Sequence, residues 1–300
     1  MTSQPTTQKV LFMGLGASGK SSIRAVAFEG KSPIDVTDYR ATINYTRSSK
    51  HIIDSAFQIF DCGGQESFIS AFVGEQAEFI FSDVDLLIWV VDVSDFDQVS
   101  TSKFYFDQAV KRLDEYSPHA EIFCFFHKID LILLNMKEQI LETMKSYFVP
   151  NRGNFVIHYK GTSIFDQSIY SAVGEIVQGI IRKNTKAKTV SEAIQEFVEA
   201  NKELSGIAVY TEEGLPVFEE GDLANLIVVP ANLLLTTLDR LVTEFRSDTF
   251  KTTMETNDYL FIFQRIKSEL LLTGVAHKIA PLQYMMVKMD QLAGLVEDLL

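Results

Sequence analysis

The stretch Gly14-Leu15-Gly16-Ala17-Ser18-Gly19-Lys20-Ser21 is the most informative part of this chain. It fits the phosphate-binding loop pattern G-x-x-x-x-G-K-[ST] at every fixed position. The apolar run at residues 9–13 predicts a buried strand before the loop, and residues 21–28 predict a helix after it. This strand–loop–helix order favours a phosphate loop over the alternative, a glycine-rich turn that opens a helix without a ligand.

The residues of this loop suit the phosphates of a nucleotide. Its glycines let backbone N–H groups turn toward a phosphate, and the helix N-terminus adds a partial positive charge. We expect Lys20 to reach the β- and γ-phosphates and the Ser21 hydroxyl to ligate Mg²⁺. The candidate nucleotide-binding residues of this segment are Gly14, Ala17, Ser18, Gly19, Lys20, Ser21 and Ser22.

Strands and helices alternate through residues 9–182, which we expect to form one domain after a flexible N-terminus at residues 1–8. The alternation predicts an α/β fold, a mostly parallel sheet with helices on both faces. Ligands in such folds bind outside the carboxyl ends of the strands. Further strands are expected at residues 56–61, 85–92, 121–127 and 154–159, and a last helix at residues 169–180.

The pattern changes after a polar, basic segment at residues 183–190, which we interpret as a linker. Residues 191–300 then predict a smaller antiparallel α+β domain. Its expected helices are residues 191–204, 229–245 and 281–300, and its expected strands are residues 206–210, 215–218, 247–255, 259–266 and 270–277.

A second candidate segment, Asp61-Cys62-Gly63-Gly64-Gln65, follows a predicted strand. We expect Asp61 to hold Mg²⁺ by way of a water molecule and the Gly64 backbone N–H to contact the γ-phosphate. Gln65 would orient the attacking water. Lys20, Gly64 and Gln65 are therefore the candidate catalytic residues.

A third segment, His127-Lys128-Ile129-Asp130, follows the strand at residues 121–127. A carboxylate at Asp130 can accept hydrogen bonds from guanine N1–H and the exocyclic amine, a pair that adenine cannot supply. Loss of such a paired contact discriminates on the order of a thousandfold. We expect Lys128 to lie against the base plane and the phosphate loop; a solvated charge pair is the alternative. Candidate base-binding residues are His127, Lys128, Asp130, Ser163 and Ile164, the last two offering a backbone N–H to guanine O6.

The segment between residues 27 and 49 should supply one more magnesium ligand. Thr42 is our choice and Thr37 the alternative, so the candidate metal ligands are Ser21, Thr42 and Asp61. No arginine is placed as a catalytic finger, and we expect Arg24 and Arg40 to make structural or surface contacts. Intrinsic hydrolysis should therefore be slow and need a partner for acceleration.

Bulk properties narrow the choice of partners. The 300 residues carry a net charge of −13, which argues against non-specific binding to nucleic acid or an anionic membrane. We expect no transmembrane helix, signal peptide or lipid anchor, so that membranes are reached only through partners. With two cysteines and no predicted bridge, the chain suits a reducing cytosol.

Together these motifs resemble those of the Rag/Gtr family of small GTPases. Two features are discriminating: His127, where Ras-like proteins usually carry Asn, and the Asp-Cys-Gly-Gly-Gln segment, which resembles the RagA/Gtr-A branch rather than the RagC branch. Residues 191–300 resemble a roadblock (longin-like) domain, the dimerisation module of that family. The resemblance implies a phosphate-loop G domain followed by this smaller domain.

The resemblance also implies a function. It implies GTP and GDP binding with Mg²⁺, slow hydrolysis, and dimerisation with a second copy or a related chain through the C-terminal domain. It further implies roadblock scaffold proteins, GTPase-activating factors and exchange factors as partners, in nutrient signalling or a primitive equivalent. Two alternatives stay open: a nucleotide-stabilised assembly scaffold with little turnover, and an Arf-like trafficking GTPase.

Overall fold

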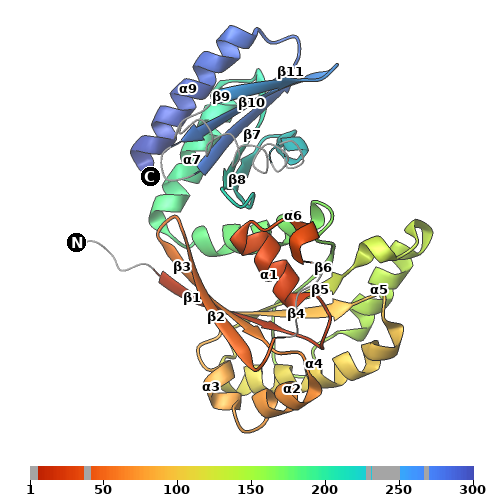
Figure 1. The fold of residues 1–300 in the computed structure, drawn as a ribbon. Helices are drawn as coiled ribbons and strands as arrows, with labels where there is room; N and C mark the ends of the chain where they lie inside the picture. The colour runs from red at the N-terminus through yellow and green to blue at the C-terminus, as the bar shows by residue number, and fades with distance from the viewer. Residues whose placement is uncertain (1–5, 37–41, 228–230, 232–250, 267–269) are drawn as a thin grey trace. The chain divides into compact units, whose positions relative to one another are not determined.

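A computed structural model gives the fold of residues 6–36, 42–227, 231, 251–266 and 270–300. These residues divide into two compact units. The first holds residues up to His51 together with Ser55–Ala172, and the second holds Ile52–Asp54 together with Val173–Leu300. Each unit is built on a sheet of its own (Figure 1).

The first unit contains a six-stranded sheet in the order β2-β3-β1-β4-β5-β6. The central pairs are parallel, and β4 and β5 are apolar and buried almost throughout, as strands covered on both faces must be. The strands are β1 (Thr6–Met13), β2 (Tyr45–Ile52), β3 (Ser55–Cys62), β4 (Leu86–Asp92), β5 (Glu121–His127) and β6 (Ile157–Thr162).

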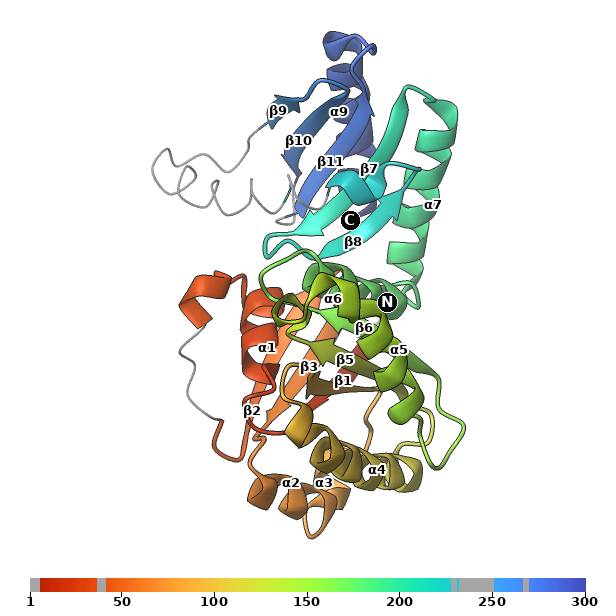
Figure 2. The same cartoon turned by 90° about the vertical axis from the view of Figure 1, so that its right-hand side faces the viewer.

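Helices cover both faces of this sheet (Figure 2). On one face, α2, α3, α4 and α5 enclose a core around Trp89 and Phe126. On the other face α1 packs against β1, where the Phe12 and Phe28 rings meet edge to face. The helices are α1 (Lys20–Glu29), α2 (Glu66–Val73), α3 (Ala77–Phe81), α4 (Val99–Tyr116) and α5 (Lys137–Tyr147); α6 (Ser168–Ile181) begins in this unit and continues into the second.

The α/β class and the order of elements expected from the sequence are confirmed for this unit. One strand was not predicted: β2 is largely polar and exposed at the sheet edge, so no apolar pattern marks it. The last strand lies later than expected, at Ile157–Thr162, because residues 154–156 precede the pairing with β5. Cys62 ends β3 and is buried.

The second unit contains a five-stranded sheet in the order β8-β7-β11-β10-β9, with antiparallel pairs throughout. Helices α7 and α9 lie side by side on one face (Figure 1), and Met289 of α9 packs directly on Gly274. The predicted antiparallel α+β pattern is confirmed and fits a longin-like arrangement. The elements are α7 (Thr185–Ala200), β7 (Leu204–Thr211), β8 (Pro216–Glu220), β9 (Lys251–Glu255), β10 (Tyr259–Ile266), β11 (Leu270–His277) and α9 (Leu282–Leu299).

The segment expected as a linker is mostly helical. Residues 182–184 form a turn, and α7 begins at Thr185 because the Asn184 side chain caps it, accepting a hydrogen bond from the Lys186 N–H at 2.8 Å. The helix expected over residues 229–245 lies outside the described residues, apart from Ala231. No helix in the described part of the chain has the length and apolarity needed to span a bilayer.

Candidate nucleotide-binding site

A cavity of about 450 Å³ opens where the sequence motifs meet. Its walls come from the residues that follow β1, β3, β5 and β6, with Thr42 and Val36 closing one side. The predicted site residues that line it are Ala17, Gly19, Lys20, Ser21, Ser22, Thr42, Gly64, Gln65, His127, Lys128, Asp130 and Ile164. Gly14, Ser18, Asp61 and Ser163 are predicted site residues that do not line it.

The phosphate loop has no room for other residues at two of its glycines. Gly14 has a φ of 143°, and a Cβ there would lie 2.2 Å from the Val90 carbonyl oxygen. Gly19 has a φ of 97°, and a Cβ there would lie 2.5 Å from the His127 ring. Gly14 therefore lets the loop pack against Val90 of β4, while Gly19 lets residues 127–130, the candidate base-recognition segment, approach the loop.

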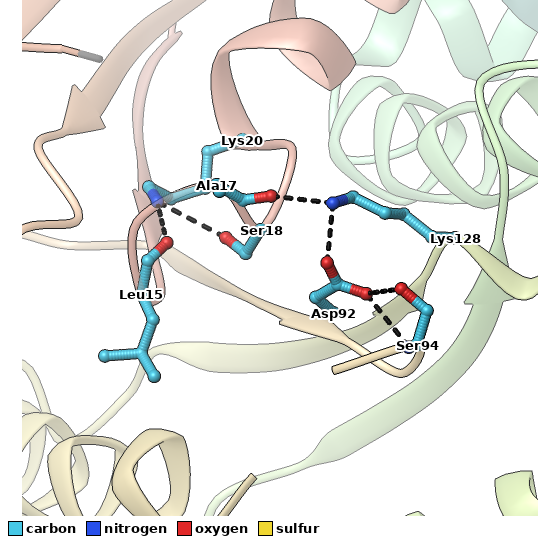
Figure 3. Close-up of polar contacts among 7 residues, drawn as sticks. All are labelled: Leu15, Ala17, Ser18, Lys20, Asp92, Ser94 and Lys128. Carbon is cyan, nitrogen blue, oxygen red and sulfur yellow. Dashed lines mark hydrogen bonds and ion pairs between the residues drawn. The ribbon is translucent and has the colours of Figure 1, made fainter. Parts of the chain in front are cut away.

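Lys20 lies at the centre of the loop. Its Nζ donates to the Leu15 carbonyl at 2.7 Å and to Ser18 Oγ at 3.3 Å (Figure 3). Ser18 thus helps to orient Lys20 and does not itself line the cavity. Burial lowers the pKa of Lys20 to about 8, with Asp61 as the leading opposing influence. A phosphate group would supply the negative charge that this buried ammonium lacks.

The three predicted metal ligands offer hard oxygen atoms, which Mg²⁺ prefers. Ser21 Oγ and Thr42 Oγ1 lie 2.8 Å apart at the cavity. Asp61 is buried; its Oδ2 accepts from Arg24 Nε at 3.4 Å, while Oδ1 has no hydrogen-bond partner among the residues that the structure describes. An unpaired buried carboxylate oxygen fits a site completed by a hydrated cation. The alternative ligand, Thr37, lies outside the described residues, as does Arg40.

The segment after β3 comes close to the phosphate loop. A Cβ on Gly64 would lie 2.5 Å from the Leu15 carbonyl, so only glycine fits against that backbone. Gln65 follows as the exposed residue that precedes α2, and it lines the cavity. This places the candidate water-orienting residue on a surface that a partner can reach.

His127 ends β5 and lies between β6 and the phosphate loop. Its Nδ1 is 3.0 Å from Thr162 Oγ1, and its ring contacts the α-carbon region of Gly19. Burial, reinforced by Lys128, lowers the pKa of His127 to about 4, so the ring is neutral at pH 7. His127 therefore acts here by packing and hydrogen bonding rather than by charge.

Lys128 connects the base-recognition segment to two other loops. Its backbone has a φ of 64°, and its Nζ donates to the Ala17 carbonyl at 2.9 Å. The same Nζ pairs with Asp92 Oδ2 at 2.5 Å (Figure 3). Sequence reasoning missed Asp92, although an acid at the end of an otherwise apolar strand was a signal that could have found it.

The segment after β6 differs from its expected role in one respect. The Ser163 N–H donates to Ser168 Oγ at 2.8 Å, so it is already engaged. Ile164 lines the cavity, together with three apolar side chains that were not predicted: Val36, Leu131 and Phe165. Leu131 and Phe165 are largely exposed and line the same cavity as Asp130. Their apolar side chains offer a surface on which a planar base could pack.

The fold and this site define a phosphate-loop protein with a G domain. A family profile described as the Gtr1/RagA G protein conserved region matches residues 9–213, more than half of the chain. The chain belongs to this Gtr1/RagA G protein family, which confirms the resemblance found in the motifs.

Individual relatives agree with this assignment. "GTP-binding protein GTR1" of Saccharomyces cerevisiae is 32% identical over 202 residues, covering 64% of this chain and 63% of that protein. "GTP-binding protein gtr1" of Schizosaccharomyces pombe is 30% identical over 194 residues, covering 64% and 62%. "Ras-related GTP-binding protein B" of Rattus norvegicus is 26% identical over 226 residues, covering 66% and 60%. The chain thus spans less than two thirds of the length of these relatives.

Proposed function

We propose that this chain binds GTP and GDP with Mg²⁺ and acts as a guanine-nucleotide-dependent switch that hydrolyses GTP slowly. One observation carries the proposal: a single cavity brings Asp130 together with Lys20 and the Ser21–Thr42 hydroxyl pair. A base-reading carboxylate and a phosphate-binding ammonium at one cavity are what a nucleoside phosphate requires. The printed names of the family relatives, GTP-binding proteins, support the same ligand.

Asp130 is the residue that selects the base. Its carboxylate accepts two hydrogen bonds from guanine, while the Lys128 stem offers an apolar surface for the ring. The exposed faces of Leu131 and Phe165 lie at the same cavity and supply further contact. An adenine in this place would leave Asp130 facing the N1 acceptor of the base, which is repulsive.

The phosphates of the nucleotide and the Mg²⁺ ion are bound by N–H groups and oxygen atoms of this chain. Lys20 pairs with the β- and γ-phosphates, and backbone N–H groups of residues 16–21 surround them. Ser21 and Thr42 would hold Mg²⁺ directly and Asp61 through water. When bound, Mg²⁺ neutralises part of the phosphate charge that builds up during hydrolysis.

Hydrolysis would depend on Gln65, which orients the water that attacks the γ-phosphate. Arg24 is engaged by Asp61 and Glu29, so its guanidinium is not directed at the cavity. Hydrolysis that relies on Gln65 alone is slow, and a GTPase-activating factor accelerates it. Single-turnover hydrolysis with Mg²⁺ separates this switch from a scaffold that binds GTP without cleaving it.

The C-terminal domain, residues 191–300, serves as the dimerisation module, pairing with a second copy or a related chain. Its antiparallel sheet with α7 and α9 supports this assignment by its longin-like arrangement. Roadblock scaffold proteins and exchange factors complete the set of partners, in cytoplasmic nutrient signalling with membranes reached only through those partners. Sedimentation of the full chain across a range of concentrations tests the dimer.

The nucleotide assignment is tested by competition for a fluorescent GDP analogue. GTP and GDP should displace it from the wild-type protein, whereas ATP should not. Asp130→Asn should shift preference toward xanthosine triphosphate, because the amide can donate to the xanthine 2-oxo group. Equal competition by ATP would show that Asp130 does not read the base, and the proposal would then be wrong.

A further inference from the structure

Asp92 stands out because it is charged, largely enclosed and outside every motif described above. It is the last residue of β4, a strand otherwise made of buried apolar side chains. Its side chain is 15% exposed. A carboxylate in such a place must be satisfied by specific partners.

Both oxygens of Asp92 have partners. Oδ1 accepts hydrogen bonds from the Ser94 N–H at 2.9 Å and from Ser94 Oγ at 2.6 Å. Oδ2 pairs with Lys128 Nζ at 2.5 Å (Figure 3). Burial alone would raise the pKa of Asp92, but hydrogen bonds from Lys128 and Ser94 outweigh it and lower the pKa. The carboxylate is therefore ionised at pH 7 and held in one orientation by Ser94.

The partner of Asp92 is the residue that joins two ligand-binding segments. Lys128 Nζ also donates to the Ala17 carbonyl, 111 positions away in the chain. Lys128 and Ala17 both have positive φ angles, 64° and 59°, which non-glycine residues rarely adopt. Such backbone geometry persists only where the surroundings enforce it. One ammonium thus links two strained loops, and Asp92 is the anion that holds it there.

We infer that Asp92 is a positioning residue for the nucleotide: it holds Lys128 as a brace between the base-recognition segment and the phosphate loop. The inference rests on the proposed function and extends it to a residue that does not touch the ligand. Without Asp92, the Lys128 ammonium keeps one acceptor, and its stem is free to leave the base plane. The segment that binds the base is then no longer joined to the loop that binds the phosphates, and the nucleotide dissociates faster.

The test compares dissociation rates of a fluorescent GDP analogue from the full chain with Mg²⁺. Asp92→Asn should release GDP about tenfold faster than the wild type, since one charge-assisted hydrogen bond is weakened. Ser94→Ala should have a smaller effect in the same direction. Asp97→Asn, an exposed aspartate in the same loop, is the matched control and should leave the rate unchanged.

A double-mutant cycle distinguishes positioning from general weakening of the fold. Lys128→Met alone should speed release more than Asp92→Asn, and adding Asp92→Asn to Lys128→Met should add little. The rate of single-turnover hydrolysis at saturating GTP should stay near the wild-type value in Asp92→Asn, so that affinity changes and the chemical step does not. Additive effects of the two substitutions, or an unchanged release rate in Asp92→Asn, would overturn the inference.

Asp130→Asn, measured in parallel, separates this inference from the proposed function. If Asp130→Asn loses guanine selectivity while Asp92→Asn releases GDP at the wild-type rate, only the role of Asp92 is wrong. If Asp130→Asn retains the wild-type selectivity, the guanine-nucleotide assignment itself fails.

Discussion

The hydroxyl oxygens of Ser21 and Thr42 lie 2.8 Å apart, although 21 positions separate them in the chain. Ser21 belongs to α1, at the end of the phosphate loop, and Thr42 lies in the connection to β2. Both line the same cavity. Two hydroxyls this close are a suitable arrangement for a small divalent cation, and the buried Asp61 Oδ1, which has no hydrogen-bond partner in the described part of the chain, could bind a water of its hydration shell.

Thr42→Ala should therefore weaken the magnesium dependence of GTP binding. We expect the Mg²⁺ concentration for half-maximal GTP affinity to rise about tenfold, since one direct ligand is lost. Titration of Mg²⁺ at fixed GTP measures this shift. Thr37→Ala is the matched comparison; if it reproduces the shift and Thr42→Ala does not, Thr37 is the ligand.

Lys20 should make nucleotide affinity depend on pH in the alkaline range. Burial lowers its pKa to about 8 in the free protein, and bound phosphates would raise it again. Binding therefore takes up a proton above pH 8, and affinity should fall by up to about tenfold for each further pH unit. Calorimetry in buffers of different ionisation enthalpy should give uptake approaching one proton at pH 9; at pH 6.5 Lys20 should take up none, and the terminal phosphate of the nucleotide should release protons instead. Equal uptake at both values would contradict this role for Lys20.

Gln65→Leu should bind GTP as the wild type does but hydrolyse it at least about tenfold more slowly, because an apolar side chain cannot orient water. Single-turnover hydrolysis with Mg²⁺ measures the rate. Gln76→Leu is a control with another exposed glutamine that precedes a helix. A wild-type rate in Gln65→Leu would remove Gln65 from the list of catalytic residues.

His127 should make folding stability depend on pH in the acid range. Its pKa is about 4 in the folded protein and its ordinary value is 6.5, so the unfolded chain binds a proton that the folded protein does not. The free energy of unfolding should therefore fall as pH decreases from 6.5 to 4, by up to about 1.4 kcal/mol per pH unit from this group.

Chemical unfolding of His127→Asn tests this contribution. The variant lacks the titrating ring, so its stability relative to the wild type should improve steadily as pH falls through that window. His51→Asn, a change at an exposed histidine, should leave the slope as it is in the wild type. Parallel slopes for wild type and His127→Asn would show that burial of this ring is not the cause.

Much of the fold follows from local pattern. The apolar runs of β4 and β5 predicted buried parallel strands, because only a strand covered on both faces is apolar throughout. The strands expected at residues 206–210 and 215–218 pair as the hairpin of β7 and β8, and Gly214 at the end of the turn between them has the positive φ that such a turn requires. β2 was not predicted because an exposed edge strand has no apolar periodicity. The first turns of α7 were not predicted as helix, because Asn184, which caps them, lies within a polar, basic stretch.

Local motifs were enough to predict Lys20, Asp61 and Asp130 as candidate site residues, since the spacing of fixed residue types is a local property. The contacts that hold those residues in place could not be predicted in this way. Asp92 meets Lys128, and Arg24 meets Asp61, across 36 and 37 positions. Such contacts depend on the order and register in which β1, β3, β4 and β5 assemble, and that assembly is a property of the whole sheet rather than of any one segment.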